Sequence, residues 1–216
     1  MNKPKTENRK PKTALRIFLT GVGGQGTLLA SRLLGEAALV AGLNPLVSET
    51  HGMAQRGGVV VSTVVLGAQS PLISPGEADV VLGFEALEAF RALDRCHPRT
   101  LVIANTAAIV PYPVAVGQAK YPEISEIMAL LAGQVGGLLA FDAGALARQA
   151  GSPLAVNMVL LGALAATDYL PFPSAGLVDL IRTRTNPKYL EANLQAFQLG
   201  QGAARDAANW LKKLKD

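Results

Sequence analysis

Gly21, Gly23 and Gly26 form a G-x-G-x-x-G sequence between a short apolar run and a segment with helical periodicity. Glycines at this spacing permit a sharp turn, let backbone approach a phosphate, and let the following helix pack closely on the strand. The free N–H groups at the start of the helix attract an anion, and the hydroxyl of Thr27 could add a donor. The motif predicts a phosphate-binding turn, but a turn that binds nothing has the same sequence.

A second polar motif, ETHGMAQRGG, spans residues 49–58. Arg56 could bind a phosphate or carboxylate through two hydrogen bonds, and His51 could transfer a proton near neutral pH. Taken singly, an arginine is more often a surface ion-pair partner, and a histidine more often satisfies a local hydrogen bond. Together, in a glycine-rich loop beside a possible anion site, they favour a binding site or a subunit contact.

Glu49 ends a predicted strand roughly 20 residues after the glycine turn, where an acid can hold a ribose hydroxyl in dinucleotide-binding proteins. This spacing keeps open a stand-alone NAD(P)-dependent oxidoreductase. A non-catalytic nucleotide-binding regulatory protein is a third possibility.

Apolar runs and helical periodicity predict the elements that must position these motifs. Strands are expected at 15–20, 45–49, 58–67, 79–83, 101–105 and 137–142. Helices are expected at 27–41, 85–93, 144–149, 153–166, 174–183 and 187–213. The alternation of strands and helices predicts an α/β fold with a doubly wound, mostly parallel, Rossmann-like sheet and C-terminal helices.

The positive charge is concentrated at the N-terminus. Residues 1–12 contain five basic residues and one acid, which leaves 15 basic and 15 acidic residues in the rest of the chain. We therefore expect a disordered basic tail at 1–13 and a single domain at 14–216. A neutral folded body gives no reason to expect nucleic-acid binding.

Cys96 is the only cysteine, which excludes an internal disulfide and a cluster held by four cysteines of this chain. The longest apolar stretch, 153–167, is too short to span a bilayer, and no secretory signal is present. A cytoplasmic protein without a membrane segment is expected. No metal site and no catalytic residue are assigned.

GVGGQG followed by ETHGMAQRGG and VVVSTVV resembles the gamma subunit or domain of 2-oxoacid:ferredoxin oxidoreductases. The HGMAQRGG form is most similar to the small subunit of the indolepyruvate type. The resemblance continues through SPLISPGEADVVLGFEALEA and NMVLLGALAA to NPKYLEANLQAFQLG, so it covers nearly everything from Leu15 to Gly200.

The resemblance implies a subunit that is inactive alone. A large alpha subunit would carry thiamine diphosphate, Mg and 4Fe-4S clusters and would pass electrons to ferredoxin. The reaction implied is the oxidative decarboxylation of an arylpyruvate with coenzyme A. The runner-up within the family is a gamma subunit of a pyruvate, branched-chain or 2-oxoglutarate ferredoxin oxidoreductase.

The resemblance also implies site residues. A cofactor phosphate, such as one of coenzyme A, would contact Gly21, Gly23, Gly24, Gln25, Gly26 and Thr27. The substrate pocket or subunit interface would be lined by Glu49, His51, Gln55, Arg56, Gly57 and Gly58.

Overall fold

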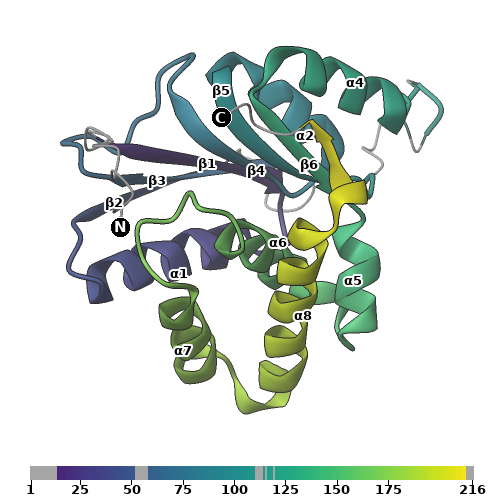
Figure 1. The fold of residues 1–216 in the computed structure, drawn as a ribbon. Coiled ribbons are helices and arrows are strands. Elements are labelled where there is room, and N and C mark those ends of the chain that lie inside the picture. Colours follow the sequence, from purple (N-terminus) through teal and green to yellow (C-terminus); the bar gives the residue numbers. More distant parts are fainter. Residues whose placement is uncertain (1–13, 52–57, 110–113, 115, 119, 213–216) are drawn as a thin grey trace, which may run out of the picture.

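The computed structural model describes residues 14–51, 58–109, 114, 116–118 and 120–212, and its ribbon is drawn in Figure 1. The strands are β1 (Leu15–Val22), β2 (Pro45–His51), β3 (Val59–Leu66), β4 (Ala78–Gly83), β5 (Cys96–Asn105), β6 (Gly137–Phe141) and β7 (Trp210–Lys212). The α-helices are α1 (Thr27–Val40), α2 (Ala86–Arg91), α4 (Ile124–Gln134), α5 (Ala143–Gln149), α6 (Val156–Ala165), α7 (Ser174–Arg184) and α8 (Pro187–Arg205). Short 3-10 turns are η1 (Ala92–Arg95), η2 (Pro153–Ala155) and η3 (Ala207–Asn209).

The seven strands form one sheet in the order β2-β3-β1-β4-β5-β6-β7. Strands β1, β4, β5 and β6 pair in parallel, whereas β3 is antiparallel to both β1 and β2, and β7 is antiparallel to β6. Five of the seven strands therefore run in one direction. The predicted α/β fold with a mostly parallel sheet is confirmed.

Helices cover both faces of the sheet, as expected for a doubly wound fold (Figure 1). Side chains alternate along β1, so that Ile17 and Leu19 pack in one hydrophobic cluster with α1, α5, α6, α7 and α8. Phe18, between them, packs in the opposite cluster with α2 and α4. The C-terminal helices thus enlarge one layer of the core. Among the described helices, none has the length and apolarity to cross a membrane.

The position of β2 differs from the predicted parallel strand-helix-strand unit. Strand β3 lies between β1 and β2, and β2 forms the edge of the sheet. The reason is composition. Strand β3 (VVVSTVVL) is apolar enough for an interior position, whereas β2 contains Ser48, Glu49 and Thr50 and tolerates an edge.

The helices differ from the predicted ones in two places. The last helix was expected to reach 213, but α8 ends at Arg205 and Trp210–Lys212 form β7 on the open edge of β6. The backbone of β6 gains a hydrogen-bonding partner in this way. Helix α4 was not predicted, although Ile124, Ile127, Met128 and Leu131 recur at helical spacing.

Candidate functional site

The carboxyl ends of β1, β4, β5 and β6 meet at one edge of the sheet. Helix α1 follows β1 and helix α2 follows β4, and the two helices cover opposite faces of the sheet. The chain therefore leaves these neighbouring strands toward opposite faces, and the strand order reverses between them. Such a switch point is where open α/β sheets place their ligands. The glycine turn and the end of β2 lie at the same edge, because Gly21 is opposite Val60, which is opposite His51.

The glycine turn begins two residues later than predicted, since Gly21 and Val22 still belong to β1. Gly24 and Gly26 have φ angles of 97° and 80°, a region that favours glycine. A Cβ atom at Gly24 would meet nothing within 4 Å, so the backbone there is open to a ligand. Helix α1 has no side-chain cap and no acid in its first turn, which leaves its N-terminal N–H groups suited to an anion.

The first and third glycines are required by close packing. A Cβ atom at Gly21 would lie 2.7 Å from Cβ of Phe84, and one at Gly26 would lie 2.6 Å from Nδ2 of Asn157. Thr27 is only 2% exposed, so its side chain faces the interior. Close packing therefore requires glycine at both positions, at Gly21 within β1 and at Gly26 against the start of α6.

Gln25 uses both ends of its carboxamide inside the protein. Oε1 accepts from the N–H of Val22 at 2.7 Å, and Nε2 donates to the carbonyl of Phe84 at 2.7 Å. The side chain therefore fixes the turn against β4. A ligand at this turn would be held by backbone groups.

The two sequence motifs are joined directly. The N–H of Gly23 donates to the carbonyl of Gly58 at 2.9 Å, which links the glycine turn to the end of the polar motif. Gln55, Arg56 and Gly57 lie outside the described residues.

Glu49 does not occupy the position of the ribose-binding acid in the dinucleotide pattern. Its strand is separated from β1 by β3, which places it two strand spacings, about 10 Å, from β1. Both carboxylate oxygens face Arg32 of α1, at 3.2 and 3.4 Å. The geometry removes one of the two features that favoured a stand-alone NAD(P)-dependent enzyme, the other being the glycine turn.

Asn105, at the end of β5, is a residue of this edge that the motifs did not identify. Its Oδ1 accepts from the N–H groups of Ala107 and Ala143, and its Nδ2 donates to the carbonyl of Phe84. Because Gln25 donates to the same carbonyl, two carboxamides connect the ends of β1, β4, β5 and β6. The position of Asn105 as a polar residue at the end of an apolar strand is the sequence feature that could have identified it.

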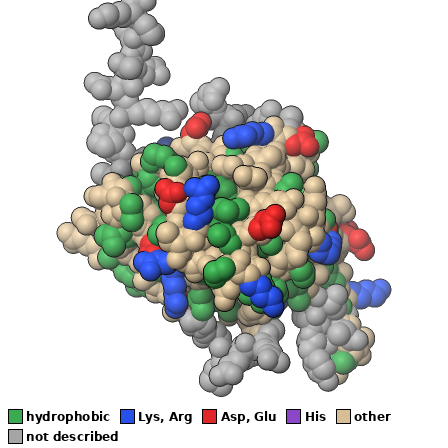
Figure 2. All heavy atoms as spheres, turned by 90° about the horizontal axis from the view of Figure 1, so that it is seen from below, with side chains coloured by type: hydrophobic (Ala, Val, Ile, Leu, Met, Phe, Trp, Pro, Cys, Tyr) green, Lys and Arg blue, Asp and Glu red, His purple; other side chains and the backbone are tan. Residues whose placement is uncertain are grey.

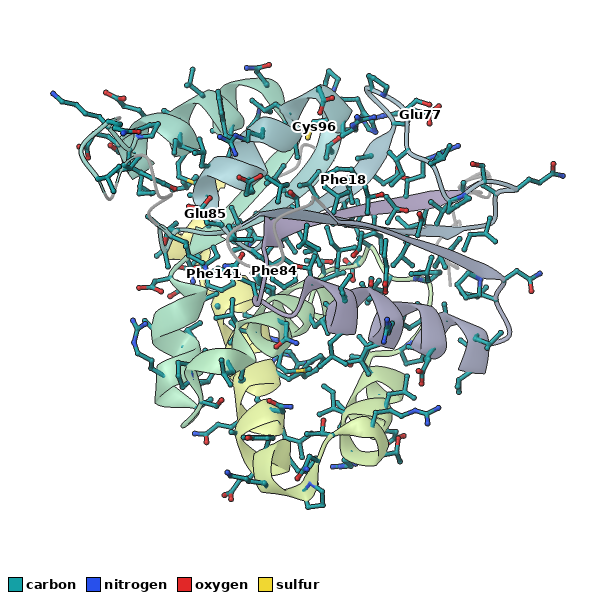
Figure 3. The ribbon with its side chains drawn as sticks, turned by 180° about the vertical axis from the view of Figure 1, so that it is seen from behind. Phe18, Glu77, Phe84, Glu85, Cys96 and Phe141 are labelled. Carbon is teal, nitrogen blue, oxygen red and sulfur yellow. The ribbon has the colours of Figure 1, made fainter. Side chains whose placement is uncertain are left out.

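Glu85 caps helix α2 and is 2% exposed. Oε2 accepts from the N–H groups of Leu87 and Glu88, and Oε1 accepts from the N–H of Ile109 and the hydroxyl of Tyr121. Burial raises the pKa of Tyr121, and the hydrogen bond to Glu85 raises it further. In Figure 3, Phe84 and Glu85 lie at the same end of the sheet as Phe141.

Two further titratable groups lie on the α2 side of the sheet. Burial raises the pKa of Glu88, against the opposing effect of Arg91 at 2.6 Å. Burial, with a smaller contribution from Asp94, raises the pKa of Cys96 to about 12. A buried thiol of this kind is a poor metal ligand and nucleophile. Within the described ranges, no cluster of His, Cys, Asp and Glu could hold a metal ion.

Comparison with known proteins adds a family match. The family model described as pyruvate ferredoxin/flavodoxin oxidoreductase matches residues 16–203. Indolepyruvate oxidoreductase subunit IorB of Methanothermobacter thermautotrophicus is 42% identical over 192 residues, covering 88% of this chain and 98% of that protein. The 2-oxoglutarate synthase subunit KorC of the same organism is 27% identical over 190 residues, covering 86% of this chain and 92% of that protein.

A solved structure shares the fold. The gamma subunit of keto/oxoacid ferredoxin oxidoreductase from Geobacter sulfurreducens superposes with a TM-score of 0.65 at 22% sequence identity. The match covers 88% of this chain and 98% of that one. The two chains therefore share the architecture of the domain from β1 to α8.

Proposed function

The chain belongs to the pyruvate ferredoxin/flavodoxin oxidoreductase family, and from this premise we propose that it is the small subunit of an indolepyruvate:ferredoxin oxidoreductase. The assembled enzyme would convert an arylpyruvate and coenzyme A into an aryl-acetyl thioester and carbon dioxide. The carboxylate carbon leaves as CO2, the thiol sulfur forms the new bond to the acyl carbon, and two electrons reduce ferredoxin.

The observation that carries this proposal is the extent of the match to IorB. Identity of 42% extends over 98% of that protein, whereas identity to a 2-oxoglutarate synthase subunit of the same organism is 27%. The sequence HGMAQRGG in the polar motif also favours the indolepyruvate type. The indolepyruvate type is therefore favoured over the pyruvate, branched-chain and 2-oxoglutarate types.

The cofactors are assigned to a large partner subunit. A 4Fe-4S cluster requires several thiolates, whereas this chain has one cysteine, and its thiol is buried with a raised pKa. Thiamine diphosphate and its Mg would supply the carbanion chemistry from the partner, and the clusters would pass electrons to ferredoxin. The complex is expected in the cytoplasm.

For this chain we assign a positioning role at the edge of the sheet. The exposed backbone of Gly24 and the uncapped start of α1 would hold a phosphate, which coenzyme A provides. The polar motif, tied to the glycine turn through Gly58, would face the partner subunit or the thioester-forming pocket. Arg56 and His51 are the side chains of that motif suited to such contacts.

Coexpression tests the proposal. The full chain purified alone should show no turnover with nicotinamide cofactors or with indolepyruvate. Coexpressed with a large subunit that carries ferredoxin-type cysteine clusters, it should give a brown complex that reduces viologen with indolepyruvate and coenzyme A. Turnover by the isolated chain, or failure to form a complex, would contradict the proposal.

Arg56→Ala tests the polar motif within that complex. We expect a higher coenzyme A requirement or weaker subunit association, because a cation for a phosphate or carboxylate is lost. Arg182→Ala is the matched control, since Arg182 is largely exposed and its pairing with Asp179 within α7 should contribute little. Equal behaviour of the two variants in both assays would exclude Arg56 from the site.

A further inference from the structure

Glu85 is a buried acid at the end of β4, and its two carboxylate oxygens have different partners. The side chain is 2% exposed and lies at the same end of the sheet as Phe84 (Figure 3). Oε2 accepts from the N–H groups of Leu87 and Glu88 at 2.8 and 3.1 Å and so caps helix α2. The cap needs one oxygen, which leaves the second free for another role.

The second oxygen binds both ends of the connection from β5 to α4. Oε1 accepts from the N–H of Ile109 at 3.2 Å and from the hydroxyl of Tyr121. Burial and the hydrogen bond to Glu85 raise the pKa of Tyr121, so its hydroxyl keeps its proton and donates. We call these two hydrogen bonds the anchor. The structure describes residues 106–109, 114, 116–118 and 120–123 of the connection.

The backbone that carries the anchor is fixed against the glycine turn. The N–H of Phe84 donates to the carbonyl of Thr20 at 2.8 Å. Its carbonyl accepts from Gln25 of the turn and from Asn105. Because Glu85 is the next residue, the anchor brings the start of the connection back from β5 to the end of β4, the strand next to β1.

The start of the connection adds an exposed apolar group to this edge. The N–H of Ala107 donates to Oδ1 of Asn105 at 3.1 Å. Two residues further on, Ile109 is 41% exposed, although its N–H is bound to a buried carboxylate. An apolar side chain on a backbone that is already held suits a binding surface, because ordering a free segment on binding costs conformational entropy.

We propose that Glu85 is a positioning residue of the candidate site, which holds Ile109 and the start of the connection as a wall beside the glycine turn. The proposal rests on the proposed function, since the ligand bordered by this wall is the coenzyme A of that reaction. Glu85 touches no substrate. Without the anchor the connection must be ordered each time the ligand binds, which weakens binding and leaves the chemical step on the partner subunit unchanged.

Two substitutions separate the anchor from the helix cap. Glu85→Asp keeps a carboxylate that can cap α2, but its shorter side chain does not reach Ile109 and Tyr121. Tyr121→Phe removes one donor of the anchor and leaves the cap intact.

Tyr189→Phe is the matched control, since Tyr189 lies in α8 and is 43% exposed. Helix α8 begins at the bottom of the view in Figure 1, away from the strand ends that carry the anchor. Figure 2, which looks at the molecule from below, shows acidic and basic side chains scattered among hydrophobic ones on that face.

Hydrogen exchange of the full chain, followed by NMR, measures the anchor directly. In Glu85→Asp the amide of Ile109 should exchange about ten-fold faster or more, because its charged acceptor is lost. The amide of Leu87, which donates to the cap, should keep its protection. Tyr189→Phe should exchange like the original chain at both amides. Unchanged exchange of Ile109 in Glu85→Asp would overturn the proposal.

Kinetics of the coexpressed complex test the positioning role. Glu85→Asp and Tyr121→Phe should each raise KM for coenzyme A about five-fold or more at unchanged kcat, and Tyr189→Phe should leave both constants unchanged. A purely structural role would reduce the yield of the complex without changing KM. Unchanged KM in both variants overturns the proposal, and Tyr121→Phe alone decides it if Glu85→Asp does not fold.

The two proposals fail in different ways. If the complex reduces viologen but neither variant changes KM for coenzyme A, the positioning role fails and the proposed function stands. If no active complex forms, the proposed function fails, and the exchange of Ile109 still decides whether Glu85 holds the connection.

Discussion

At the scale of single residues, two carboxamide groups connect the strand ends at the candidate site. Gln25 and Asn105 both donate to the carbonyl of Phe84, and Asn105 also accepts from the strand-to-helix connection at Ala143. The oxygen and the nitrogen of each carboxamide are hydrogen-bonded within the protein, so these residues position the edge and leave ligand contacts to the backbone of the turn.

Ser62 and Thr63, adjacent on β3, provide a matched test of buried hydroxyl groups. The Oγ of Ser62 is buried without a hydrogen-bond partner among the described residues, whereas Oγ1 of Thr63 donates to the carbonyl of Pro71 at 2.7 Å. Ser62→Ala should raise the free energy of unfolding by about 1 kcal/mol, because an unsatisfied polar atom is removed. Thr63→Val should lower it by about 1 kcal/mol.

Urea unfolding of both variants, followed by circular dichroism, measures these changes. The two variants should change the free energy of unfolding in opposite directions. A loss of stability in Ser62→Ala would mean that the hydroxyl has a partner in solution.

Cys96 should react slowly with disulfide reagents. Its ordinary pKa of 9.0 is raised to about 12, so at pH 8.5 the thiolate fraction of the folded chain falls by two to three orders of magnitude, roughly. The rate with Ellman's reagent should be reduced to match, and unfolding in guanidinium should restore it. A folded chain that reacts at the unfolded rate would contradict this burial.

The same shift has a consequence for stability at high pH. Because the folded pKa is above the unfolded one, the thiol's contribution to stability is fully present below pH 9.0 and is lost as the pH rises toward 12. Cys96→Ala should therefore flatten the decline of stability in that window.

At the scale of elements, the crossing of α6 and α8 depends on two glycines. A Cβ atom at Gly162 would lie 2.0 Å from the carbonyl oxygen of Phe197, and one at Gly200 would lie 1.9 Å from that of Val159. The helices thus pack backbone against backbone, and this contact holds Asn157 at the start of α6 beside the glycine turn.

Gly200→Ala should lower the free energy of unfolding by more than about 3 kcal/mol, or prevent folding, because neither backbone can move without displacing its helix. Gly202→Ala, in the same helix with nothing within 4 Å of its added Cβ, should instead raise it by about 0.5–1 kcal/mol. Thermal unfolding compares the pair, and similar melting temperatures would refute the close crossing.

At the scale of the whole molecule, the end of the chain returns to the sheet. Strand β7 pairs with β6, Nε1 of Trp210 donates to the carbonyl of Ala204, and Nζ of Lys212 donates to that of Ala132. This closure covers the edge of β6 and joins α8 to α4.

Deleting residues 206–216 should lower the free energy of unfolding by about 2–4 kcal/mol, because the packing of Trp210 and several hydrogen bonds are lost. The open edge of β6 should also promote association. Urea unfolding and light scattering measure both effects, and a chain lacking only residues 213–216 is the control. Equal stability of the two truncations would show that β7 is dispensable.

The sequence by itself determined the layers of the fold and the two motifs of the site. Apolar runs identified β1, β3, β4 and β6, because strands covered on both faces are mostly apolar in sequence. The glycine at position 42 also predicted the end of α1. In the structure Gly42 has a φ of 79°, and the N–H of Leu43 donates to the carbonyl of Ala38, as is usual where a helix ends at glycine.

Only the tertiary structure decided which strands are neighbours and which polar groups meet. Three features join residues that are far apart in sequence. They are the insertion of β3 between β1 and β2, the hydrogen bond from Gly23 to Gly58, and the pairing of Trp210 with β6. Local propensity carries no information about such pairings, because their free energy comes from contacts that exist only once the chain has closed. The roles of Gln25, Asn105 and Asn157 follow from those contacts.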